Sequence, residues 1–223
     1  MRTICALLSS LGLSLTHAAE KVWTIMPVGD SITEGGDTFS NYREPLARRL
    51  KTAGYSVKFV GSRERTSTMG VLAHEGYGGK NSAFLAKIVP QNYQKYRADI
   101  VLLHACHNQF ANQGPVPGLV RDHQSMIDSF RRSNPDVIVL VAGPIPSAKL
   151  PKYSYLPAAC EALELMVKNY QKTHAKVIFV DQSVGFDAKK DTITDMVHPN
   201  AKGAEKMAER WFAAISSIID RPQ

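Results

Sequence analysis

The feature that most constrains the fold is an alternation of short apolar runs with longer amphipathic stretches. Runs rich in Val, Ile and Leu, typical of strands buried on both faces, occupy residues 22–28, 57–60, 100–104, 137–142 and 177–180. Amphipathic stretches typical of helices occupy 42–53, 82–96, 120–132, 158–174 and 201–219. Buried strands that alternate with helices favour right-handed crossovers. The sequence therefore predicts the α/β class, in three layers, with helices on both faces of a parallel sheet of about five strands.

The size and composition suit one such domain. The chain has 223 residues, of which 44% are hydrophobic and 21% charged, which excludes a disordered chain. Three cysteines are too few for a disulfide framework. After Glu20 there is no linker, internal repeat or long block of like charge. We therefore expect one folded domain.

The first residues have the pattern of a secretory signal peptide. Arg2 supplies the basic start, and residues 4–15 form an apolar run that is too short to span a bilayer. Small residues follow at the minus-three and minus-one positions of a cleavage after Ala18, with Ala19 the alternative. We expect a signal peptide at 1–18, a domain at 19–223, no transmembrane span and a secreted or periplasmic protein. A buried N-terminal helix is the competing interpretation.

The net charge of +7 raises the question of an anionic partner. The basic residues are scattered over predicted helix faces and loops, where solvation is their ordinary role, and no nucleic-acid-binding motif accompanies them. We therefore expect no nucleic acid as partner. A basic exterior would suit anionic polysaccharides or outer-membrane surfaces. The sequence leaves the oligomeric state open.

A serine follows the first predicted strand, in the segment GDSITEGG at 29–36. Ser31 stands near glycines that permit a sharp turn, which would present its hydroxyl at the end of the sheet. The same segment is also typical of an ordinary turn and helix cap. Because ligands bind beyond the carboxyl ends of parallel strands, partners for Ser31 are expected in the loops that follow the other strands.

A candidate partner pair lies just before the last predicted helix. Asp195 and His198 are three residues apart, so one short turn can hold the carboxylate against the imidazole. A serine hydroxyl needs a base to take its proton, and the base needs a group that fixes its tautomer. The sequence therefore predicts a Ser31–His198–Asp195 triad for acyl transfer.

Acyl transfer also needs hydrogen-bond donors for the oxyanion of the tetrahedral intermediate. In HEGYGGKNS, the glycines at 76, 78 and 79 allow a backbone N–H to approach a ligand. In HACHNQF, the amide of Asn108 stands just beyond the third predicted strand. Glycine-rich turns and loop asparagines are common, so neither segment alone indicates an oxyanion hole, and each does so only together with the triad.

Four sequence blocks together resemble the SGNH, or GDSL-type, serine hydrolases. They are GDSIT at 29–33, a second-block glycine at Gly79, a third-block asparagine at Asn108, and the DxxH segment at 195–198. The likeness extends over about residues 22–213. It implies a flavodoxin-like α/β/α sandwich and hydrolysis of esters or thioesters without a cofactor or metal.

The resemblance also implies a role for each matching residue. Ser31 would be the nucleophile, His198 the general base and Asp195 its orienting partner. The oxyanion hole would consist of the Ser31 N–H, the Gly79 N–H and the Asn108 side chain.

The third block departs from the family pattern Gly-x-Asn-Asp. Cys106 replaces the glycine and Gln109 replaces the acid, which bears on local geometry and substrate preference. The stretch HEGYGG at 74–79 is similar to that of acetyl-xylan-esterase-like members, which favours acetylated carbohydrate as substrate. Asp30, His107 and Gln109 are candidate substrate-binding residues.

Three other interpretations concern the same segment. His104, Cys106 and His107, with His74, resemble a metal site, but 104 and 106 face one way along a strand and 107 the other, and no CxxC or HExxH occurs. A thiol nucleophile at Cys106 is disfavoured because Ser31 already accounts for His198. A disulfide between Cys106 and Cys160 stays open.

The sequence thus predicts a secreted serine esterase that hydrolyses short-chain esters, acetyl first, on a small molecule or a polysaccharide. The alternative is a lysophospholipase or thioesterase acting on longer acyl chains. A non-catalytic polysaccharide-binding module is disfavoured because such a module has no need of a general base.

Overall fold

The sheet is built around β1 (Trp23–Gly29), whose last five residues are buried. The computed structural model describes residues 21–219, so the predicted signal peptide at 1–18 lies outside the described residues. Six further strands complete the sheet: β2 (Val57–Phe59), β3 (Arg63–Ser67), β4 (Gly70–Gly76), β5 (Ile100–His104), β6 (Ile138–Gly143) and β7 (Val177–Asp181).

The strand order is β3-β4-β1-β5-β6-β7, and β2 also pairs with β1. β1, β5, β6 and β7 pair in parallel, for example Ile25 with Ile100 and Ile100 with Ile138. β2 pairs with the first half of β1, and β4 with its last two residues, Val28 and Gly29. The predicted α/β class with a parallel sheet is confirmed.

The hairpin of β3 and β4 was not predicted. These two strands pair antiparallel, from Arg63 with His74 to Ser67 with Gly70. β3 reads RERTS and contains no apolar residue, because it lies at the margin of the sheet with much of its surface exposed. A search for apolar runs therefore misses β3, and the sheet has seven strands instead of the predicted five or so.

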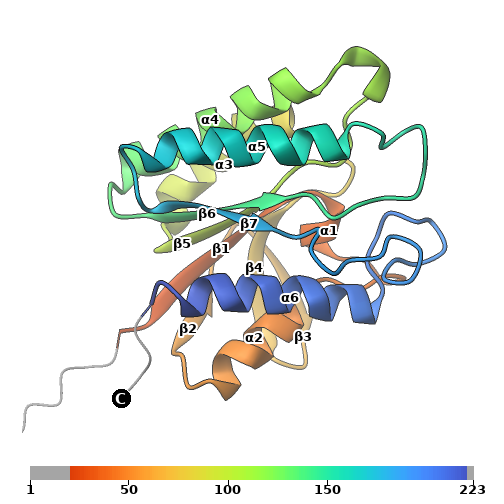
Figure 1. The fold of residues 1–223 in the computed structure, drawn as a ribbon. Helices are drawn as coiled ribbons and strands as arrows, with labels where there is room; N and C mark the ends of the chain where they lie inside the picture. The colour runs from red at the N-terminus through yellow and green to blue at the C-terminus, as the bar shows by residue number, and fades with distance from the viewer. Residues whose placement is uncertain (1–20, 220–223) are drawn as a thin grey trace, which may run out of the picture.

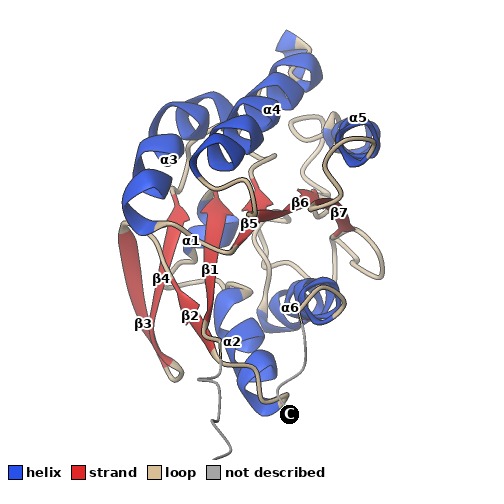
Figure 2. Ribbon diagram, turned by 90° about the vertical axis from the view of Figure 1, so that its left-hand side faces the viewer, coloured by secondary structure: helices blue, strands red, loops and turns tan. Residues whose placement is uncertain are grey.

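Helices cover both faces of the sheet (Figures 1 and 2). α3, α4 and α5 lie on one face, and α2 and α6 on the other, while the short α1 lies at the carboxyl end of β1. Their bounds are α1 (Ser31–Glu34), α2 (Arg43–Thr52), α3 (Ser82–Tyr96), η1 (Ala111–Gln113), α4 (Val116–Ser133), α5 (Leu156–Gln171) and α6 (Ala201–Ser216). Within residues 21–219, no helix combines the length and hydrophobicity that crossing a bilayer requires.

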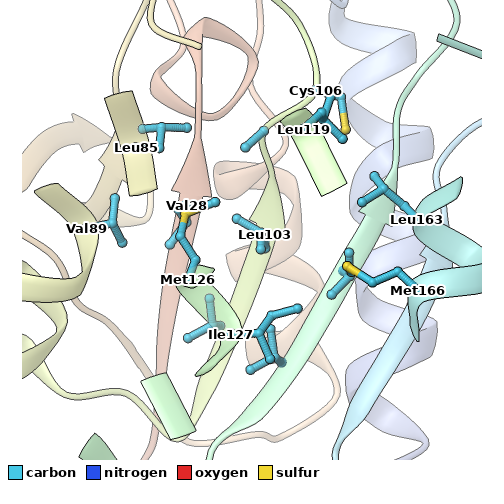
Figure 3. Packing of buried hydrophobic residues seen from close by; sticks show 14 of the residues in the cluster. Val28, Leu85, Val89, Leu103, Cys106, Leu119, Met126, Ile127, Leu163 and Met166 are labelled. Carbon is cyan, nitrogen blue, oxygen red and sulfur yellow. The ribbon is translucent and has the colours of Figure 1, made fainter. Parts of the chain in front are cut away.

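The core is divided by the sheet into two clusters. Alternate residues of β5 point to opposite faces, so Val101 and Leu103 join the cluster under α3, α4 and α5, whereas Ile100 and Leu102 join the cluster over α2 and α6. Figure 3 shows part of the first cluster, with Val28 of β1 and Leu103 of β5 side by side. Burial on both faces explains why these strands were recognisable as continuous apolar runs.

Candidate active site

Ser31 begins α1 at the carboxyl end of β1. The turn into the helix is capped by Asp30, whose carboxylate accepts from the backbone N–H of Ile32 at 3.0 Å. Gly29 is required at this point, because a Cβ there would lie 2.2 Å from the carbonyl oxygen of His104. The local sequence thus brings β1 close to β5 and leaves the Ser31 side chain only partly buried.

The structure joins Ser31, His198 and Asp195 in one hydrogen-bonded series. Ser31 Oγ is 2.8 Å from His198 Nε2, and His198 Nδ1 is 2.5 Å from Asp195 Oδ2. Asp195 Oδ1 accepts from the backbone N–H groups of Val197 and His198 at 2.9 and 3.0 Å. Burial opposes ionisation, but the hydrogen bonds from His198 and from the two backbone groups outweigh it and hold the pKa of Asp195 below its ordinary value. The carboxylate is therefore charged at neutral pH and orients the imidazole.

The ring of Phe39 lies against the ring of His198, a contact that the sequence did not indicate. The two rings are stacked, with centroids 4.1 Å apart and planes at 26°. A Cβ at Gly36 would lie 2.2 Å from Phe39 Cε1, so the glycine is needed to admit the phenyl ring. The adjacent Ser40 N–H donates to the carbonyl of Pro199 at 3.1 Å, which ties the loop to the histidine segment.

The glycines of the second block have different roles. A Cβ at Gly76 would lie 2.5 Å from the backbone nitrogen of Glu34, so Gly76 permits close packing on α1. The Gly78 N–H donates to Glu34 Oε2 at 2.6 Å, and a Cβ on Gly78 would come within 3.7 Å of Ser31 Cβ. Gly79 has a φ of +73° and open space beside it. The segment therefore lies next to Ser31, and Gly79 is its freely approachable glycine.

Asn108 is held beside this glycine segment. Its backbone has a φ of 66°, in the left-handed region, and its Nδ2 donates to the carbonyl of Lys80 at 3.3 Å. Gln109, which is half-buried, donates from Nε2 to Ser82 Oγ at 2.8 Å. The structure thus places the second-block and third-block residues together at the edge that carries Ser31.

A buried arginine, Arg43, fixes the helix that carries Ser31. It is 1% exposed and donates to the carbonyl oxygens of Thr33, Glu34 and Leu72 at 2.8, 2.9 and 2.7 Å. Burial lowers its pKa to about 10, so it stays protonated at neutral pH. Carbonyls at a helix end need partners, and a cation there is favourable. No sequence signal distinguishes this arginine from the surface arginines of the same helix.

Asp30, His104 and His107 form a buried polar cluster beneath Ser31, and their side-chain ligand atoms all lie within 4.8 Å of one another. Burial raises the pKa of Asp30 to about 7 and lowers that of His104 to about 4. Asp30 and His107 are at most 1% exposed, so neither side chain offers a surface to substrate. The sequence suggested Asp30 and His107 as substrate-binding residues. Because both are buried, they support the segment around Ser31 instead.

Two imidazoles and a carboxylate are chemically able to hold a metal ion. His107 Nδ1 is 4.0 Å from Asp30 Oδ2, however, whereas ligands of a tetrahedral zinc ion at about 2.0–2.1 Å lie roughly 3.4 Å apart. His74 belongs elsewhere, since its Nδ1 accepts from the Gly76 N–H at 3.0 Å. The donor set is suitable, but its spacing would have to contract.

Cys106 and Cys160 are both free thiols.

A parallel α/β sheet that presents a serine, a histidine and an aspartate in series has the arrangement of a serine hydrolase. The sequence model of the GDSL-like lipase/acylhydrolase family matches residues 28–206, and the chain belongs to that family. This places it among the carboxylic ester hydrolases and confirms the resemblance drawn from the four blocks.

Comparisons with individual proteins agree. A family 3 carbohydrate esterase from Clostridium thermocellum superposes with a TM-score of 0.76 at 28% identity, covering 86% of this chain and 94% of its own. An acetyl esterase mutant solved with acetate gives a TM-score of 0.76 at 25% identity, covering 88% and 98%. A multidomain esterase of Ruminococcus flavefaciens is 28% identical over 236 residues, 89% of this chain, and the chain spans only 29% of its length.

Proposed function

We propose that this chain is a secreted serine esterase that removes short acyl groups, acetyl first, from carbohydrate. The observation that carries the proposal is the hydrogen-bonded series from Ser31 through His198 to Asp195. The similarity to a family 3 carbohydrate esterase and to an acetyl esterase supports the substrate class. Export rests on the signal-peptide pattern at 1–18.

The geometry supports a two-step mechanism. Asp195 accepts from His198 Nδ1, which leaves Nε2 free to take the proton of Ser31 as Oγ attacks the ester carbonyl carbon. The carbonyl oxygen becomes an oxyanion, for which the Ser31 N–H, the Gly79 N–H and Asn108 Nδ2 are the proposed donors. The bond to the alcohol then breaks, and the alcohol leaves with the proton from His198.

The acyl-enzyme is hydrolysed by the same groups. His198 takes a proton from a water molecule, the hydroxyl attacks the acyl carbon, and the second tetrahedral intermediate collapses. The acid leaves and Ser31 recovers its proton from His198. Every step uses protein groups and water alone, and therefore the mechanism needs no cofactor.

The deciding experiment compares wild type with Ser31→Ala on p-nitrophenyl acetate and on acetylated xylan. We expect kcat/KM to fall at least about ten-thousandfold in Ser31→Ala. Ser67→Ala is the matched control, because the Ser67 hydroxyl bonds within its own turn, where it donates to the carbonyl of Gly70 and accepts from the N–H of Met69. Activity that survives Ser31→Ala would reject the proposed nucleophile.

Substrate class is tested with acetyl, octanoyl and palmitoyl esters of one alcohol. We expect the acetyl ester to have the highest kcat/KM. Preference for the palmitoyl ester would favour a lysophospholipase or thioesterase. Polysaccharide binding without hydrolysis, and without labelling of Ser31 by an organophosphate, would favour a binding module. For export, mass spectrometry of the secreted protein should find an N-terminus near Ala19, and an intact Met1 would contradict it.

A further inference from the structure

A pocket of about 430 Å³ lies beyond the carboxyl ends of β6 and β7, against the start of α5. Its walls are largely apolar and include Pro146, Leu150, Tyr153, Leu156 and Cys160. Its volume lies in the range of about 300–1,000 Å³ that is usual for small-molecule sites. The triad does not use this space, since neither Ser31 nor His198 is among the described residues that line it.

The pocket adjoins the loop that carries the histidine of the triad. Ser147, in the pocket wall, donates from Oγ to the carbonyl of Met196 at 2.6 Å, two residues before His198. Tyr153, also in the pocket wall, has its ring 5.5 Å from the ring of His107, and the backbone N–H of His107 donates to Asp30 beside Ser31. The pocket walls therefore contact both the loop that carries His198 and the cluster that supports Ser31.

The position of His198 distinguishes the two parts of the ester. In the proposed mechanism the imidazolium gives its proton to the alcohol oxygen, so the alcohol part lies on the His198 side of the reacting carbon. The proposed oxyanion donors, Gly79 and Asn108, come from the loops after β4 and β5. The pocket belongs to the loops after β6 and β7 and is bonded to the His198 loop. It therefore lies where the alcohol part is held.

Three exposed apolar side chains belong to the pocket lining or to segments joined to it. Leu150 is 67% exposed, and Val184 and Met196, which stand next to the pocket-forming Ser183 and the Ser147 bond, are 52% and 42% exposed. Large apolar side chains gathered on one exposed rim commonly mark a binding surface. Among the described residues that line the pocket there is no charged side chain, and its polar groups are hydroxyls and the Cys160 thiol; the Lys152 ammonium lies beside the lining, 5.2 Å from the centroid of the Tyr153 ring. This lining selects an uncharged group.

We propose that this pocket is an alcohol subsite that binds an uncharged apolar ring, aryl or aralkyl, carried by the alcohol part of the ester. The inference rests on the proposed esterase function and extends it. An aromatic ring would pack on Leu150 and Leu156, and a hydroxyl on its edge would find the serines of the wall. The acyl group stays outside this subsite.

The test compares benzyl acetate with ethyl acetate, because the two alcohols are leaving groups of similar acidity and differ in the ring. Ser154→Trp fills the pocket from its exposed side, and Leu150→Ser removes apolar surface at the mouth. Leu165→Ser, an exposed position on α5 outside the pocket lining, is the matched control. Thermal unfolding verifies that all three variants are folded.

We expect the benzyl-to-ethyl ratio of kcat/KM to fall about fivefold or more in Ser154→Trp and Leu150→Ser, mainly through a higher KM for benzyl acetate. The Leu165→Ser variant should hydrolyse both esters as wild type does. A ratio that is unchanged in both pocket variants overturns the proposal. So does a loss that follows acyl length, measured with ethyl acetate and ethyl hexanoate, because the pocket would then hold the acyl chain.

A binding measurement separates this proposal from the proposed function. Saturation-transfer NMR with benzyl alcohol reports binding without turnover, and the signal should disappear in Ser154→Trp and persist in Leu165→Ser. If wild type binds benzyl alcohol in this way but hydrolyses no ester, the subsite stands and the proposed function fails. The converse outcome is that wild type hydrolyses ethyl acetate while benzyl alcohol gives no signal, or gives a signal that Ser154→Trp leaves unchanged. In that case the esterase function stands and the subsite fails.

Discussion

The two halves of the carboxyl edge of the sheet are built on different physical principles. The reactive half comprises the loops after β1, β4 and β5, and the open half comprises residues 143–157 and 183–184 around the pocket. In the reactive half, buried charged groups such as Arg43 and Glu75 are satisfied by several hydrogen bonds each. The open half instead presents apolar walls and exposed side chains such as Leu150.

The two halves differ because only the reactive half requires a fixed geometry. A nucleophile must be held within a fraction of an ångström of its base, and directional hydrogen bonds to the surrounding loops restrict its position more than apolar contacts do. An apolar pocket is non-directional and tolerates changes of shape. The reactive half therefore supplies the fixed geometry that the proposed reaction needs, and the open half supplies the adaptable surface that the proposed alcohol subsite needs.

Acidification should have the largest effect, because it charges histidines that are buried in the reactive half and in the neighbouring core. Burial, reinforced for His74 by nearby arginines, lowers the pKa of His74 to about 3, and burial lowers those of His104 and of His123 in α4 to about 4. Their neutral forms are favoured in the fold, so stability is complete above about pH 6.5 and is lost as the pH falls toward about 4. Over two pH units the loss is about 3 kcal/mol for each histidine.

Asp30 acts in the opposite direction, because burial raises its pKa to about 7 and its stabilising contribution is lost as the pH rises from about 4 to 7. The three histidines outnumber it, so urea unfolding should show a net fall in the free energy of unfolding from pH 7 to 4.5. His104→Leu should flatten this profile. A profile that is level in wild type would refute the assignment of buried neutral histidines.

Replacing Arg43 by Met should be the most damaging single substitution in this comparison. It removes a buried cation and leaves the carbonyls of Thr33, Glu34 and Leu72 without their donor, which costs about 3–5 kcal/mol. Arg48→Met is the control, because Arg48 is exposed and its ion pair with Glu205 is worth at most about 1 kcal/mol. Urea unfolding at pH 7 measures both. Equal losses would remove the distinction between buried and surface arginines.

Phe39 tests whether packing helps Asp195 to orient the base. In Phe39→Leu the stacked contact with His198 is lost, worth about 1 kcal/mol, so kcat should fall about fivefold with KM unchanged. Phe39→Tyr keeps the ring and should restore kcat. Phe212→Leu, which loses an aromatic contact with Tyr55, is the control. If Phe39→Leu instead raises KM at unchanged kcat, Phe39 contacts substrate and does not position His198.

The sequence predicted those parts of the molecule that repeat a physical pattern. The strands buried on both faces are continuous apolar runs, and α3 and α6 begin after Asn81 and Asn200, whose side chains accept from backbone N–H groups. Ser31, Asp195 and His198 were recognisable because acyl transfer requires these residue types, and the structure brings them within hydrogen-bonding distance. The roles that we assign to them stay predictions.

The sequence could not predict contacts that depend on tertiary packing. Phe39 and Arg43 have no local signature, since a phenylalanine in a loop and an arginine in an amphipathic helix are ordinary surface residues until the chain folds. Burial of Asp30 and His107 depends on how the end of β1 meets the loop after β5. The family resemblance singled out Gly79, but the physical difference between the second-block glycines lies in their neighbours, which are α1 for Gly76 and open space for Gly79.

The smallest expected effect concerns metal removal, which tests whether the buried cluster of the reactive half is purely structural. His107 Nδ1 and Asp30 Oδ2 are 4.0 Å apart, and Asp30 already accepts from the N–H groups of Ile32 and His107, so drawing the ligands together would strain the cap of α1. We therefore expect dialysis against a chelator to leave both kcat/KM for p-nitrophenyl acetate and the melting temperature unchanged. Elemental analysis of the purified protein is the companion measurement. The opposite outcome is a stoichiometric metal ion whose loss lowers the melting temperature of wild type but not of His104→Leu. It would show that the cluster contracts around an ion, and that coordination as well as hydrogen bonds stabilises the reactive half.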